Sequence, residues 1–201
     1  MIIVIAKTAT QVLLIVLALA VVAGAVLHFC FPQVMATFTE KVGNYHLATY
    51  YQSQVYNNTG DVADLTRCVD DAILSGDDKN IVQFGDALIS HEKFDEVCDA
   101  KNREFANISL NFKQYVCGKV AISKYNLRDF NGAILLAKTA NGITSFENNN
   151  ALITLSLKIV QAKDTVCAIE MLSGLDGISP TSSTDVSRLN QIKQILTDLG
   201  D

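Results

Sequence analysis

Two pairs of adjacent carboxylates, Asp70-Asp71 and Asp77-Asp78, are the residues of this 201-residue sequence with the clearest capacity for chemistry. Carboxylates placed together can bind a metal ion or act as general acid and base. Neighbouring residues of a helix point in different directions, however, and Asp77-Asp78 precedes a helical pattern whose first turn is stabilised by acids. We therefore interpret both pairs as helix caps and solvated surface, and we predict neither a catalytic residue nor a metal ligand.

Other catalytic signatures are absent from the sequence. It contains no glycine-rich phosphate loop, no G-x-S-x-G elbow, no H-E-x-x-H pair and no calcium loop. The three histidines are isolated, and no cysteines have the spacing of a zinc site. We expect a protein that is not an enzyme, needs no cofactor and has no small-molecule substrate. The net charge of −5 argues against nucleic acid as a partner, because nucleic acid requires a basic surface.

Four cysteines, Cys68, Cys98, Cys117 and Cys167, lie in the region that follows residue 40. Each belongs to a helical pattern, in which a free cysteine acts as a small apolar residue. An even number of cysteines in an exported domain is also compatible with two disulfides. The sequence favours free, buried thiols and leaves the disulfide alternative open.

A long apolar segment near the N-terminus determines where the rest of the chain acts. No Asp, Glu, Lys or Arg occurs between Thr8 and Thr39, and the densest apolar part covers residues 12–31. About 20 residues allow a helix to cross a hydrocarbon core of roughly 30 Å. We predict an N-terminal flank over residues 1–11, a single transmembrane helix in the lipid bilayer over 12–32, and a juxtamembrane helix or linker over 33–44.

Two other interpretations of the apolar segment stay open. A signal peptide would be cleaved near Ala23-Gly24-Ala25, although the apolar run continues past that point. A buried core helix would carry its apolar residues on one stripe, whereas here they cover every side. For orientation, Lys7 before the span balances Lys41 after it. The free α-amino group then favours an N-terminus inside and a large domain on the extracytoplasmic side.

The rest of the chain has the pattern of an all-α domain. The sequence has two prolines, Pro32 and Pro180, and little strand-like alternation. Asp61, and Asp77 or Asp78, occupy expected N-cap positions. We expect short paired helices over about residues 45–56, 61–74, 78–88, 94–98, 111–125, 129–140, 148–162, 164–172 and 184–199.

One helix pair carries a defined motif, AISKYNLRDFNGAI, at residues 121–134. Small residues, Ala121 and Ala133, stand on facing helices, Tyr125 and Phe130 flank the turn, and Ala140 follows. This motif resembles a tetratricopeptide repeat, an αα-hairpin of 34 residues in which small residues let two helices approach closely. Arg128 replaces the usual turn glycine, Ala137 replaces an aromatic residue, and the closing proline near Ser145 is missing.

Weaker copies of the motif surround it. Leu65, Val97, Ala133 and Ala168 occupy equivalent positions of the second helix, at separations of 32, 36 and 35 residues. The resemblance implies a TPR-like αα-hairpin solenoid over residues 45–182, closed by a capping helix over 183–201. An irregular helical bundle is the alternative.

The resemblance also implies a function, since such repeats bind a peptide or partner helix on the concave face lined by their first helices. We expect a membrane-anchored, non-enzymatic scaffold that binds a protein or peptide partner. The alternative is a structural subunit of a membrane complex, assembled through the small-residue patch between Ala18 and Ala25 of the span. The candidate partner-binding residues are Tyr50, Gln54, Gln83, Lys119, Ser123 and Asn126.

Overall fold

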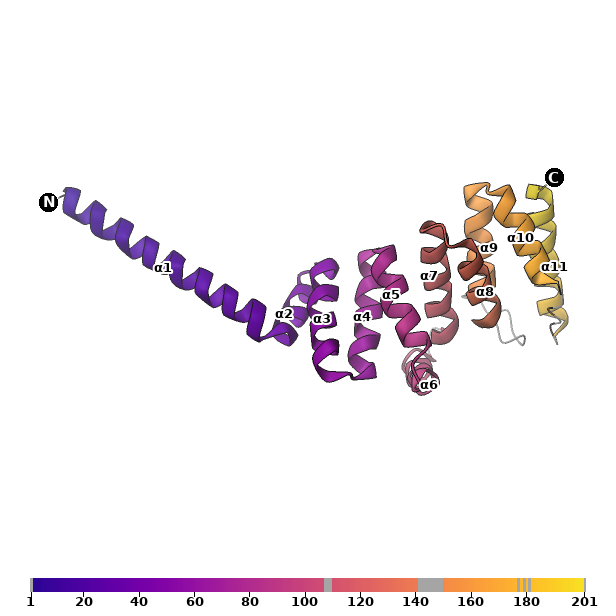
Figure 1. Cartoon of the computed structure of the whole chain (residues 1–201), viewed down its shortest axis with the longest axis horizontal. Helices are drawn as coiled ribbons and strands as arrows, with labels where there is room; N and C mark the ends of the chain where they lie inside the picture. Colours follow the sequence, from indigo (N-terminus) through magenta and orange to yellow (C-terminus); the bar gives the residue numbers. More distant parts are fainter. Residues whose placement is uncertain are drawn as a thin grey trace.

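The structure, a computed structural model, describes residues 2–106, 110–140, 150–176, 178, 180 and 182–200, with side chains from residue 12 onward. The described chain is all-helical and contains no strand, as predicted (Figure 1). The predicted helix start at Asn148 and the missing family proline near Ser145 lie outside the described residues. The helices are α1 (Ile2–Cys30), α2 (Pro32–Lys41), α3 (Tyr45–Thr59), α4 (Val62–Ser75), α5 (Asp78–Ile89), α6 (Phe94–Glu104), α7 (Phe112–Asn126), α8 (Phe130–Ala140), α9 (Ala151–Ala162), α10 (Thr165–Leu175) and α11 (Ser183–Gly200).

Helix α1 projects from one end of the molecule, away from the other helices (Figure 1). Its stretch Val12–Cys30 is long and apolar enough to cross a membrane, and none of that stretch is buried inside the protein. No other helix of the described residues meets the same criterion. The prediction of an N-terminal helix long and apolar enough to cross a membrane is confirmed. Helix α1 ends at Cys30, before the predicted end of the span at residue 32, and its placement and orientation in a membrane stay predictions.

Five pairs of successive helices after α1 are joined by the same kind of turn. A residue with left-handed backbone is followed by Asp or Asn, and that side chain accepts a hydrogen bond from a backbone N–H in the first turn of the next helix. Glycine adopts the left-handed conformation at no steric cost, but two of the five turns place a long side chain there. The five turns are Gly43-Asn44, Gly60-Asp61, Gly76-Asp77, Arg128-Asp129 and Lys163-Asp164.

Helices α7–α11, the C-terminal half, form two layers (Figure 1). Helix α7 packs on α8 and also on α9, α8 packs on α10, and α9 packs on α11. Equivalent helices run in the same direction, because Gln114 near the start of α7 contacts Ala151 at the start of α9, and Tyr125 near its end contacts Asp164 beyond the end of α9. Such packing, repeated from one hairpin to the next, is that of a helical solenoid. The predicted capping helix is α11, which covers α9 and α10.

Helices α2–α5, the N-terminal half, form a simpler array. Each packs mainly on its neighbours in sequence, α2 on α3, α3 on α4 and α4 on α5. Helix α5 then packs on α7, and the two run antiparallel, since Asp78 at the start of α5 contacts Asn126 at the end of α7. A Cβ atom added to Gly85 of α5 would clash with Val120 Cγ2 of α7, so a larger residue here would force the Val120 side chain or the two helices to shift.

Helix α6 is where the prediction and the structure differ. We expected α6, which carries Val97, to be the second helix of a hairpin that begins with α5. Instead, α6 packs against α4 and α7, and Figure 1 shows it nearly end-on beside the upright helices. The physical reason is composition: of the residues of α6, only Phe94 and Cys98 are buried, so its apolar edge is too narrow to cover a whole helix. The regular series of four hairpins is therefore interrupted.

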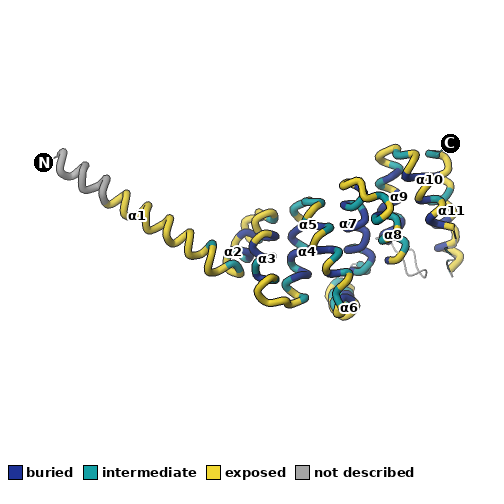
Figure 2. The backbone as a smooth tube through the Cα atoms, in the orientation of Figure 1, coloured by how far each residue is buried: buried dark blue, intermediate teal, exposed yellow. Residues whose placement is uncertain are grey.

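The core is continuous from α4 to α11 (Figure 2). Its largest fully buried side chains include Leu65, Phe112, Leu152 and Leu155. Helices α2 and α3 bury a smaller set outside that cluster, namely Ala36, Ala48, Tyr51 and Val55. The end of the array nearest α1 therefore has less apolar packing than the far end.

Candidate functional site

Three of the four paired carboxylates have structural partners. Asp77 accepts hydrogen bonds from the N–H groups of Lys79 and Asn80 and so caps α5, as predicted. Both carboxylate oxygens of Asp78 accept from Asn126 Nδ2 at 3.1 Å. Asp70 lies 3.6 Å from Lys101 Nζ of α6. These partners account for the acids without any catalytic role.

Asp71 differs from the other three because it is buried, with 4% of its surface exposed. Its Oδ2 atom has no hydrogen-bond partner. Burial raises the pKa of this carboxyl to about 7, and the neighbouring Glu40 raises it further than Arg67 lowers it. The sequence analysis placed Asp71 on the solvated surface, and that prediction is wrong. Its spacing of three residues from the buried Cys68 was a signal that could have shown this.

Asp71 belongs to a polar cluster that joins α2 to α4. Arg67 of α4 donates from Nη2 to Glu40 Oε1 of α2 at 2.7 Å. The Glu40 and Asp71 carboxyls share this neighbourhood, so protonation of Asp71 relieves the repulsion between two acids. Among the described residues, no three His, Cys, Asp or Glu side chains are grouped so as to hold a metal ion. The cluster fastens two helices together and has no geometry for metal-assisted chemistry.

The cysteines are free thiols, and Cys68, Cys98, Cys117 and Cys167 are buried. Burial raises the pKa of each of these four thiols to about 12, far above physiological pH. A thiol in this state is neither a nucleophile nor a ready metal ligand. The structure thus bears out the free, buried thiols that the sequence favoured.

The six predicted partner-binding residues lie on three helices. Tyr50 and Gln54 lie on α3, Gln83 lies exposed on α5, and the other three lie on α7. Because α5 and α7 run antiparallel, these two helices are not equivalent members of successive repeats. The grouping of the six residues as a partner-binding surface stays a prediction.

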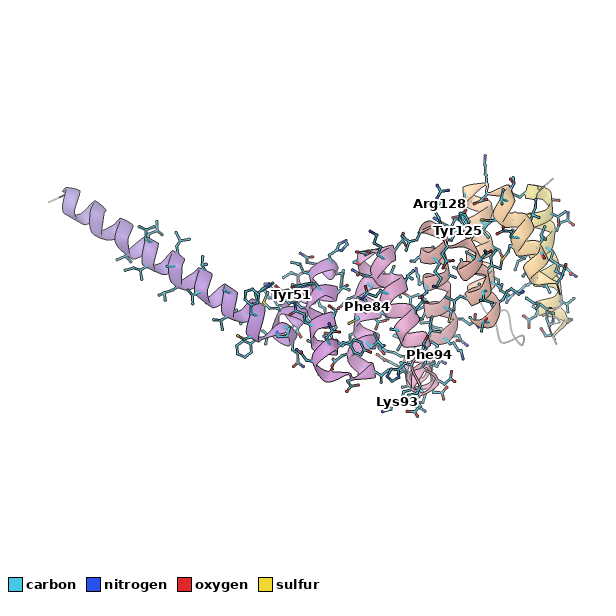
Figure 3. The ribbon with its side chains drawn as sticks, viewed as in Figure 1. Tyr51, Phe84, Lys93, Phe94, Tyr125 and Arg128 are labelled. Carbon is cyan, nitrogen blue, oxygen red and sulfur yellow. The ribbon has the colours of Figure 1, made fainter. Side chains whose placement is uncertain are left out.

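The three predicted residues of α7 have different surroundings. Ser123 is 2% exposed and is unavailable to a partner. Asn126 is exposed but engaged with Asp78, and Lys119 lies over the ring of Tyr115. Asn126 also borders a polar hollow of about 310 Å³ at the α7–α8 turn, where Tyr125 donates from its hydroxyl to Asp164 at 2.9 Å. Figure 3 shows Tyr125 and Arg128 together at this turn.

A groove that the sequence analysis missed lies between α4 and α6. It encloses about 330 Å³, and its surface is mainly apolar. Arg67, Lys101 and Glu104 place charges among the apolar residues. Such a groove can accept apolar side chains of a partner and pair with its charges. We call it the α4–α6 groove; its lining is Val62, Ala63, Thr66, Arg67, Val97, Ala100, Lys101 and Glu104.

The groove exists because α6 crosses the array. Lys113 of α7 pairs with Asp95 at 2.9 Å, and Asn102 accepts a hydrogen bond from the N–H of Phe112 at 2.7 Å. These contacts hold α6 on α7, and Lys101 ties it to Asp70 of α4. Helix α6 therefore lies across α4 without closing onto it, and the groove lies between the two helices. The narrow apolar edge of α6 is visible in the sequence, but the helices that α6 crosses are not, which is why Val97 was assigned to a helix-pair contact instead.

A second feature lies where α1 meets the array. The side chain of His28 shares a hydrogen bond with the Tyr51 hydroxyl at 2.5 Å, and its ring stacks on Tyr50 with 6.2 Å between centroids. Tyr51 is buried at this junction (Figure 3). These contacts fix the end of α1 on α3. Tyr50, predicted to contact a partner, here contacts His28 near the C-terminal end of α1.

The chain as a whole matches no model of a protein family, no curated protein and no solved structure.

Proposed function

We propose that this protein is a membrane-anchored helical-repeat scaffold that binds a protein or peptide partner close to the membrane, without catalysis. The observation that carries the proposal is α1, whose 19-residue apolar stretch has no protein covering. Leaving so much apolar surface in water is unfavourable, and a bilayer removes that cost. The helical array beyond it has a core of its own and can stand outside the lipid.

The tetratricopeptide-like part of this proposal concerns α7–α10. Ala121 and Ala133 are fully buried in the first pair, and Ser156 and Ala168 are buried in the second. The two pairs share the left-handed turn residue followed by a capping aspartate, and 35 residues separate Arg128 from Lys163. This spacing is close to the family's period of about 34.

The partner would bind in the α4–α6 groove. Its apolar lining favours one or two apolar side chains of a peptide or helix, with Arg67, Lys101 and Glu104 available for polar contacts beside them. Tethering by α1 raises the local concentration of the groove at the membrane, so that a weak interaction is sufficient.

A photo-crosslinking residue tests the proposal in intact membranes. It would replace Ala100 in the groove, Gly24 in the span, or the exposed Leu157 of α9 as a matched remote control. A discrete adduct at position 100, absent at 157, is the expected result. An adduct confined to position 24 would favour the alternative of a subunit assembled through its transmembrane helix. Equal labelling at 100 and 157 would contradict the groove.

A further inference from the structure

The apolar surface of this protein does not end with α1. Four apolar residues of the next segment, Phe31, Val34, Phe38 and Val42, are each between 50% and 60% exposed. Their spacing of three, four and four residues places them along one side of a helix. Scattered exposed apolar residues are ordinary, but a continuous row of them marks a surface that something covers. We call these four residues the α2 stripe.

The opposite side of α2 packs on α3. Ala36 and Thr39 are buried there, and Glu40 reaches Arg67 of α4. Ala36 lies two residues from both Val34 and Phe38, which corresponds to about 200° around the helix. At Phe38 and Val42 the α2 stripe therefore points away from the array, whereas Phe31 and Val34 also border a hollow that they share with α3. The polar cluster with Glu40 points toward the array.

The direction of α2 follows from the turn at its start. Phe31 has φ −132° and ψ 59°, outside the helical region, and Pro32 is the first residue of α2. In Figure 1, α2 runs across the direction of α1, with α1 on one side of it and α3 on the other. A bilayer that holds α1 roughly upright would have α2 lying along its surface. The α2 stripe would then face the lipid.

We propose that α2 is an interfacial helix, whose stripe inserts among the lipids at the boundary between headgroups and acyl chains. This inference rests on the proposed anchoring by α1 and goes beyond it, because it sets how the array is held on the membrane. Interfacial helices bury their apolar face about 5–10 Å into that boundary. The aromatic rings of Phe31 and Phe38, with Tyr50 and Tyr51 beside His28, gather at the level where aromatic residues concentrate in membrane proteins.

Lipid is favoured over another protein as the occupant because the α2 stripe continues the exposed apolar surface of Val12–Cys30 without an intervening charge. The first ionisable acid or cation after the span is Glu40, on the other side of the helix, and Lys41 follows at its end. With this single cation on α2, attraction to anionic lipid is small. Insertion is driven by apolar area, and it is expected to be independent of salt and of anionic lipid content.

Tryptophan fluorescence of the full chain in vesicles tests this placement, since the sequence contains no tryptophan. Phe38→Trp reports on the α2 stripe, and Thr37→Trp on the adjacent position about 100° away around the same helix. Val16→Trp reports on the span itself. The vesicles are phosphatidylcholine whose acyl chains carry bromine, a quencher, either near the headgroup or near the chain end.

We expect Val16→Trp to be quenched best by the deep bromine and Phe38→Trp best by the shallow one. Quenching of Phe38→Trp should exceed that of Thr37→Trp by about twofold, as one side of an interfacial helix faces the acyl chains. If Val16→Trp is quenched while Thr37→Trp and Phe38→Trp are quenched weakly and equally, the interfacial placement of α2 is wrong. The anchoring of α1 would then still hold. A blue-shifted but unquenched Phe38→Trp would also overturn it, because a second copy or another protein would then cover the stripe. An unquenched Val16→Trp would overturn the anchoring itself.

Discussion

The helices of the two halves of the array pack on one another in different ways. In the C-terminal half, α7–α11, helices contact partners one and two positions away, and buried polar groups are satisfied: the Gln114 side chain donates to the carbonyl of Ala140 and accepts from the N–H of Ala151. In the N-terminal half, α2–α5, helices contact mainly their sequence neighbours. The two buried side-chain oxygens without a partner among the described residues, Gln52 Oε1 and Asp71 Oδ2, both lie there.

This difference indicates a division of roles. Unsatisfied buried polar groups and a smaller core reduce stability, and such features concentrate where a protein binds or moves. The N-terminal half carries the polar cluster, the junction with α1 and one wall of the α4–α6 groove, whose other wall is α6. The C-terminal half supplies regular packing and closes the array with α11. Function is therefore expected near the membrane, and stability is expected from the far end.

The largest effect is expected from emptying the two-layer core. Leu155 of α9 is fully buried, and Leu155→Ala should lower the free energy of unfolding by about 3 kcal/mol. Leu157→Ala, two residues away and half exposed, should change it by less than about 0.5 kcal/mol. Denaturant unfolding of the detergent-solubilised chain measures both. Equal losses in the two variants would mean that the C-terminal half is not packed in two layers.

The contact between the halves is the next most sensitive place. Gly85→Ala should destabilise the array by about 1–3 kcal/mol, because its Cβ would meet Val120 at 2.2 Å. Gly118→Ala is the matched control, since its Cβ would meet the Ala151 backbone at 3.4 Å and helix propensity favours alanine. In a double-mutant cycle, Gly85→Ala combined with Val120→Ala should lower the free energy of unfolding by less than the sum of the two single losses, because the smaller side chain at position 120 removes the clash. Strictly additive effects would show that α5 and α7 do not meet there.

One carboxyl in each half should make the free energy of unfolding depend on pH, and the two dependences should have opposite sign. The pKa of Asp71 is raised from 3.8 to about 7, so its burial costs nothing below about pH 4 and destabilises the fold as pH rises toward 7. Asp71→Asn should therefore flatten this slope and stabilise the array at pH 8, by an amount on the order of 2 kcal/mol. Thermal unfolding across pH 4–8 measures it. An unchanged slope in Asp71→Asn would contradict the buried, proton-binding carboxyl.

Asp164 of the C-terminal half provides the comparison. Its pKa is lowered, mainly by the hydrogen bond from the backbone N–H of Cys167. The stabilisation from this carboxylate is complete above its ordinary pKa of 3.8 and is lost as pH falls through the lowered value. Asp164→Asn should therefore remove stability at neutral pH, where Asp71→Asn adds it.

The smallest effect is expected at the turns. Arg128 has φ +71°, which costs a non-glycine residue about 1 kcal/mol, so Arg128→Gly should stabilise the array by about 0.5–1 kcal/mol. Gly76 has the same φ in the N-terminal half, and Gly76→Ala should destabilise it by about 1 kcal/mol. Melting temperatures of the two variants should move in opposite directions. A shift of both in the same direction would contradict the shared turn geometry.

Local signals in the sequence predicted much of this fold. The capping residues Asp61 and Asp77 and the apolar length of α1 depend on neighbours along the chain, so they can be recognised without the structure. The crossing of α6 could not be predicted, because it depends on Lys113, Asn102 and Lys101, which meet their partners across the fold. The burial of Ser123 was missed for a related reason: the residue was placed by counting repeats, and the regular series is interrupted at α6.

Helix α1 is proposed to remain part of the protein and to anchor it in a bilayer. Alkaline carbonate extraction of membranes that contain the native chain, followed by intact mass measurement, tests this anchoring. We expect the protein to stay in the membrane pellet with a mass that includes residues 12–30. Release into the supernatant with a mass shortened near Ala25 would identify a cleaved signal peptide and contradict the account.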